Sequence, residues 1–119
     1  MYKRQAYSNL DYSYRYSAYE NYGDVARLNG DDDRALKAYQ QALALNPDWF
    51  ILHIKVARSY YNRAEFLPAY EHLRTYMTKV QALNLSPSRE DLELGIALAS
   101  AIKDYEMVDN YQEWLQQLQ

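Results

Sequence analysis

The chain has 119 residues, which is the size of one domain and leaves room for about six helices. Its formal net charge of −3 disfavours a nucleic-acid partner, which usually requires a basic face. Because it contains only 3 Gly and 3 Pro, helices joined by short turns are favoured over a sheet, and with 0 Cys no disulfide can form. No apolar run reaches the roughly 18 residues of a membrane-spanning helix.

The N-terminal segment carries two expectations. Residues 1–5, Met-Tyr-Lys-Arg-Gln, match the translation of a transposase end sequence used to fragment DNA, so we interpret them as a non-native scar on a truncated gene. In residues 6–15 and just beyond, Tyr12, Tyr14 and Tyr16 alternate like a strand, but three positions are too few to outweigh the helical surroundings. We interpret 6–15 as a connector from a missing upstream repeat.

Residues 16–49 form the clearest repeating unit. In its second half two alanines stand one heptad apart with a tyrosine between them, so two helices can approach closely while the aromatic ring fills the gap. A proline then ends the helix, because the residue before proline is pushed out of the helical region. The pattern resembles the tetratricopeptide repeat, whose period is about 34 residues. Its register residues here are Tyr19, Gly23, Ala35, Tyr39, Ala42 and Pro47.

Two further units follow at about that period, over residues 50–85 and 86–119. The corresponding register residues of the second unit are Ala57, Tyr60, Ala69 and Leu73. Ser88 with Asp91 makes a capping-box-like start to the third unit, whose period has slipped. The sequence therefore predicts an all-α fold: a tetratricopeptide-type right-handed superhelix of antiparallel helix pairs, with about three hairpins and a degenerate last one. We interpret most of the 14 Tyr as packing residues of these repeats.

No motif for catalysis, metal binding or cofactor binding stands out. The run from Asp31 to Asp33 lacks the central Gly and closing Glu of a calcium loop, and it precedes a helix, where acids cap free N–H groups. His53 and His72 fall on different predicted helices, and neither has a helical metal-ligand partner. No nucleophile elbow or phosphate loop is present. We predict a protein that is not an enzyme and has no catalytic, metal or cofactor site.

A protein-binding groove is the favoured functional site. In tetratricopeptide arrays the first helix of each hairpin lines a concave groove. We expect Ile51 and Ile54 to be exposed apolar anchors there, since exposed apolar patches usually mark binding surfaces. The alternative is that both pack against an upstream or returning segment. The predicted groove residues are Glu20, Asp24, Arg27, Ile51, Ile54, Arg58 and Tyr61.

Four passages, in their order along the chain, carry a more specific resemblance. They are Tyr12 to Gly23, Ala35 to Leu43, Tyr60 to Tyr70, and Leu92 to Ala99 followed by Tyr111 and Leu115. Together they resemble the PilF/PilW pilotins, lipoproteins of type IV pilus biogenesis, over roughly residues 12 to 118. In that family a Leu-Gly-Ile helix likewise opens a degenerate last repeat, as Leu94-Gly95-Ile96 does here. Tyr14 departs from the proline common in the family, and the early repeats and lipidated cysteine are missing.

The resemblance implies a function and a location. Pilotins sit on the periplasmic face of the outer membrane and help secretin subunits reach that membrane and form a ring. By resemblance the partner is a secretin subunit, and a lipid anchor is expected on the missing N-terminus, with no direct membrane span.

The alternative is a generic tetratricopeptide scaffold or co-chaperone adaptor, which would be cytoplasmic. Co-chaperones of this kind clamp acidic peptide termini with Lys, Arg and Asn. Arg27, Arg58 and Asn62 would suit such a clamp, but Glu20 and Asp24 on the same face oppose it.

Overall fold

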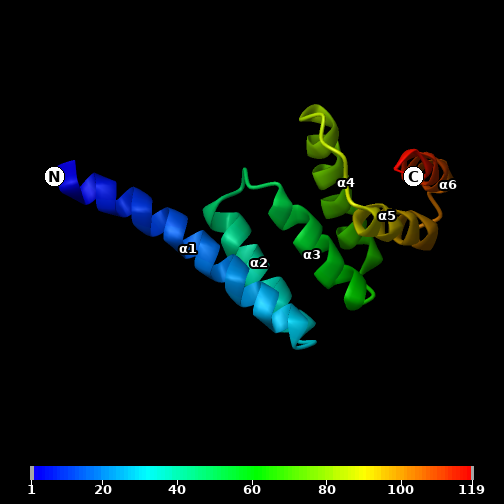
Figure 1. Ribbon diagram of the computed structural model, residues 1–119. Coiled ribbons are helices and arrows are strands. Elements are labelled where there is room, and N and C mark those ends of the chain that lie inside the picture. Colours follow the sequence, from blue (N-terminus) through cyan, green and yellow to red (C-terminus); the bar gives the residue numbers. More distant parts are fainter. Residues whose placement is uncertain (1, 119) are drawn as a thin grey trace.

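The computed structural model describes residues 2–118, with side chains from residue 14 onward. The described chain is entirely helical between its turns and contains no strand. Its helices, shown in Figure 1, are α1 (Tyr2–Leu28), α2 (Asp32–Leu45), α3 (Ile51–Asn62), α4 (Phe66–Ala82), α5 (Arg89–Ala101) and α6 (Tyr105–Gln117).

The helices pair into three antiparallel hairpins, α1–α2, α3–α4 and α5–α6, which stack in chain order. Neighbouring hairpins meet through α2 with α3 and through α4 with α5, and α3 also contacts α5 directly. The stack is elongated, with principal extents of 54 × 32 × 23 Å. We use the term inner face for the side on which α3 contacts both α1 and α5.

The segment expected to be a connector is instead part of a long helix. Residues 6–15 are helical and continue without a break into the first helix of the first repeat. The physical reason is the absence of any Gly or Pro before Gly23, so nothing in the segment stops helix propagation. Figure 1 shows the N-terminal half of α1 extending beyond α2. Met1 lies outside the described residues, and the scar over residues 1–5 stays a prediction.

Each hairpin turns through the same backbone geometry. The second residue after the first helix has positive φ in all three hairpins, at Gly30 (78°), Ala64 (60°) and Lys103 (66°). The next N–H then donates to a carbonyl five residues back, for example from Asp31 to Ala26 at 2.9 Å. This is the Schellman ending of a helix, which satisfies carbonyls that would otherwise have no partner.

Side-chain caps start three of the helices. The Asp31 carboxylate accepts a hydrogen bond from the Arg34 N–H at 3.2 Å, which is the capping role favoured over calcium binding. Ser88 caps α5 by accepting from the Asp91 N–H at 3.1 Å. Asp104 caps α6 by accepting from the Met107 N–H at 3.3 Å.

A small residue faces a large one inside each hairpin, at the same sequence separation. Gly23 on α1 meets the Tyr39 ring so closely that a Cβ on Gly23 would lie 2.5 Å from a ring carbon. Gly95 on α5 meets the Tyr111 ring in the same way, at 3.0 Å from the equivalent Cβ position. The second hairpin has Ala57 and Leu73 at these places, both fully buried. The degenerate third unit therefore keeps the internal packing of the first two.

Two clusters of buried side chains form the core. The first joins α1, α2 and α3 around Tyr39, and the second joins α3 to α6 around Leu73. Tyr60 packs against both clusters and links them. The predicted helix-crossing alanines are each 0% exposed: Ala35, Ala42, Ala57 and Ala69.

The register of the first hairpin can be tested by overfilling its core. Ala42 is 0% exposed and has no room for a larger side chain, so Ala42→Leu should lower the free energy of unfolding by about 1–3 kcal/mol. Ala44, on the exposed side of the same helix, supplies the matched control Ala44→Leu. Equal effects of the two substitutions in chemical denaturation would show that the repeat register is wrong.

Candidate protein-binding face

The inner face is organised by two cations on α3 that reach in opposite directions. The Lys55 ammonium lies 2.8 Å from Glu20 Oε2 and 3.0 Å from Asp24 Oδ1, both on α1. Arg58, one turn further along, points to α5, where its Nη2 lies 3.7 Å from Asp91 Oδ1. These contacts tie the first helices of all three hairpins together across one surface.

Each aspartate on this face also accepts a hydrogen bond from a buried tyrosine of a second helix. Tyr39 on α2 donates its hydroxyl to Asp24 at 2.6 Å, and Tyr76 on α4 donates to Asp91 at 2.7 Å. Burial, and then the hydrogen bond to the carboxylate, raise the pKa of both tyrosines well above the usual value, so both hydroxyls stay protonated donors. A carboxylate held by both a hydroxyl and a cation has little freedom to move, so the charges of the inner face are preorganised.

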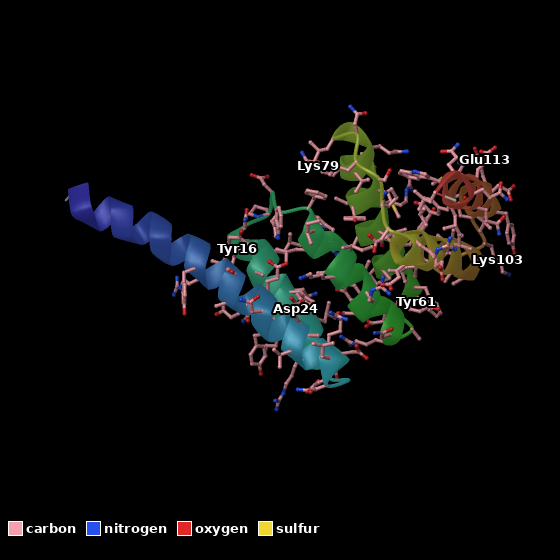
Figure 2. All side chains as sticks on the ribbon, viewed as in Figure 1. Tyr16, Asp24, Tyr61, Lys79, Lys103 and Glu113 are labelled. Carbon is pink, nitrogen blue, oxygen red and sulfur yellow. The ribbon has the colours of Figure 1, made fainter. Side chains whose placement is uncertain are left out.

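Figure 2 places Asp24 on α1 and Tyr61 on α3 near the turn into α4. Glu20, Asp24 and Arg58 do lie on the inner face, in the ion pairs described above. The sequence reasoning missed their partners Lys55 and Asp91. A signal existed for Lys55, because it precedes Arg58 by three positions and so shares a helix face with it.

The remaining predicted groove residues are only partly available. Arg27 is half-buried and lies close enough to the Tyr39 hydroxyl to oppose the rise in its pKa. Ile51 is half-buried at the start of α3. The Tyr61 ring packs against Phe66 of α4, with centroids 5.7 Å apart.

The expectation that Ile54 is an exposed anchor is wrong. Ile54 is 8% exposed and belongs to the second core cluster, together with Leu94 of α5. The reason is that the third hairpin folds back so that α5 covers this side of α3. The alternative reading, in which a returning segment covers the residue, describes Ile54 correctly.

An exposed apolar surface lies on the outer side of α1, away from the inner face. Tyr22 and Val25 are 53% and 59% exposed, whereas the residues one repeat later, Val56 and Ser59, are 0% exposed because α3 packs there against α2. Beside this row, Tyr19 is 38% exposed and lines an open groove of about 800 Å³ between α1 and α2. Two register residues, Tyr19 and Pro47, are thus exposed, while the others are buried or half-buried.

Among the described residues, potential metal clusters and membrane-spanning helices are both absent. No group of three or more His, Cys, Asp or Glu side chains within residues 14–118 is arranged to hold a metal ion. None of the described helices is both long enough and apolar enough to cross a membrane.

Comparison with known proteins identifies the fold. The tetratricopeptide repeat family model matches residues 16–49, the same range as the first predicted repeat. A solved structure of PilF from Pseudomonas aeruginosa superimposes with a TM-score of 0.75 at 24% sequence identity, over 87% of this chain and 45% of that chain. The chain thus spans less than half the length of that protein. No curated protein sequence gives a significant match. The chain has an all-α tetratricopeptide superhelix, the fold of that solved structure, which confirms the predicted fold class.

Proposed function

We propose that the chain is a non-catalytic module that holds a segment of another protein against its inner face. The observation that carries this proposal is the fold shared with PilF over 87% of the chain. Tetratricopeptide repeats generally mediate contacts between proteins, and stacked repeats create extended concave surfaces suited to that purpose.

The chemistry of the inner face supports a partner that presents both charge and apolar surface. Lys55 is already neutralised by Glu20 and Asp24, so this face does not form a cationic clamp for an acidic peptide terminus. The Arg58 side chain is about one third exposed, and its ion pair with Asp91 is long, at 3.7 Å. Ile51 stands two turns earlier on the same face of α3. The face therefore offers an Arg and an aliphatic side chain on a rigid helix, and rigidity lowers the entropy cost of binding.

The finer proposal is a pilotin-type role. The four passages that resemble PilF/PilW proteins support a secretin subunit as the partner and the periplasmic face of the outer membrane as the location, with a lipid anchor upstream. The competing proposal is a generic tetratricopeptide scaffold unrelated to pili. It is disfavoured by the order of the four passages along the chain, of which the passage containing Leu94-Gly95-Ile96 is the most specific.

Calorimetric titration with a soluble secretin fragment tests the pilotin role. We expect saturable binding with a dissociation constant of about micromolar or tighter, the range of specific interfaces of standard size. A periplasmic protein of matched size and charge serves as the control and should give no saturable signal. Absence of binding to the secretin fragment would contradict the pilotin role.

A further inference from the structure

The only 2 histidines of the chain meet between α3 and α4, away from the inner face. The Nδ1 atom of His53 on α3 lies 3.0 Å from the Nδ1 atom of His72 on α4. The ring centroids are 5.2 Å apart. This is close to the largest separation that a 3.0 Å contact between the two Nδ1 atoms allows, which is the contact distance plus one ring radius on each side. The two nitrogens therefore point at each other nearly head on, as the donor and acceptor of one hydrogen bond.

This geometry limits the number of protons that the pair can hold. In the neutral pair one ring carries its proton on Nδ1 and donates, while the other carries it on Nε2 and accepts. One additional proton leaves the contact intact, because it binds the outward Nε2 of the donating ring. A second additional proton would place N–H groups on both facing atoms and bring two positive rings within 3.0 Å.

The pair lies between an aromatic ring on one side and an open groove of mixed charge on the other. Tyr60 stacks on the His72 ring with centroids 5.9 Å apart, and its hydroxyl accepts a hydrogen bond from Gln40. Within the described chain no other His, Cys, Asp or Glu completes a cluster of three with the pair. The open groove beside His53 carries charges of both signs, from Asp48, Glu71, Arg74 and Lys79.

We propose that His53 and His72 form an acid-sensitive latch that holds α3 against α4 until both rings are protonated. The helix that the latch secures also carries Ile51, Lys55 and Arg58. Protonation of both rings therefore loosens the support of the inner face.

The direction of the pH dependence follows from burial. Burial lowers the pKa of His53, and burial together with the charge of His53 lowers the pKa of His72, with Glu71 opposing only part of the effect. In the unfolded chain both rings have the ordinary histidine pKa of about 6.5. The folded protein then binds fewer protons, so the stabilisation is complete above that pH and is lost as pH falls through the lower folded values.

Chemical denaturation at about pH 7.5 and about pH 5 measures the effect. The unfolding equilibrium constant of the wild-type chain should rise roughly 30-fold if one ring is excluded from protonation, and up to roughly 1,000-fold if both are. The control is His72→Asn, whose carboxamide can either donate to or accept from His53 Nδ1. In this variant the rise in the unfolding equilibrium constant between the two pH values should be at least tenfold smaller than in the wild type. A rise equal to that of the wild type would overturn the proposal.

NMR on the unmodified chain gives a second test that does not depend on a variant. The ring nitrogens should report opposite tautomers for His53 and His72 at neutral pH, and at about pH 5 the folded protein should carry fewer than two extra protons on the pair. Two rings that titrate independently near about 6.5 would overturn the latch, even if His72→Asn does not fold.

Discussion

Ile54→Asp should unfold the protein or leave it barely stable. Ile54 is 8% exposed within the second core cluster, so the substitution removes a buried aliphatic side chain and puts a carboxylate in its place. Loss of the apolar contacts alone costs about 2–5 kcal/mol, and an unpaired buried carboxylate adds to this. The expected loss is therefore about 4 kcal/mol or more in the free energy of unfolding, measured by urea denaturation.

Leu67→Asp is the matched control for this substitution. Leu67 is 61% exposed in the first turn of α4, where an acidic side chain is favoured by the helix dipole. Its stability should stay within about 0.5 kcal/mol of the wild type. If Ile54→Asp proved as stable as Leu67→Asp, α5 would not cover α3 as described.

Gly23→Val should have the second largest effect. A Cβ on Gly23 would lie 2.5 Å from a carbon of the Tyr39 ring, and Tyr39 is 0% exposed and hydrogen-bonded to Asp24, so the ring has little room to move. Overpacking of this kind costs about 1–3 kcal/mol, and a branched side chain brings a larger clash, so we expect about 3 kcal/mol in thermal or chemical unfolding.

A double-mutant cycle identifies the cause of this loss. Gly23→Ala with Tyr39→Leu reproduces the Ala57 and Leu73 pair of the second hairpin. The two changes together should therefore cost less than the sum of the single changes, by about 1 kcal/mol or more. If the losses of stability from the two single substitutions simply added, the contact of residue 23 with residue 39 would not be equivalent to that of Ala57 with Leu73.

The stacked helices were predictable because helix ends and repeat register are local. Pro47, Gly30 and Ser88 mark ends and turns in the sequence itself. Residues 6–15, expected to be a connector, are helical because no Gly or Pro separates them from the first repeat.

The candidate site was less predictable because it depends on how hairpins stack. Whether Ile54 faces solvent or α5 depends on the angle of the third hairpin, which follows a slipped period. The pairing of Lys55 with Glu20 and Asp24 spans residues far apart in sequence, as does the contact of His53 with His72. Neither contact has a short-range spacing that sequence analysis can detect.

The central claim is that the inner face binds the partner, and one titration tests it most directly. Ile51→Asp places an acid on the inner face in the first turn of α3, while Leu67→Asp makes the same kind of change on the outward side of α4. Both variants would be titrated with the soluble secretin fragment after denaturation has shown that they are folded. We expect Ile51→Asp to weaken binding by about 30-fold or more, the effect of losing an interface anchor, and Leu67→Asp to bind like the wild type. A folded Ile51→Asp that binds at full strength would contradict the inner face as the binding site.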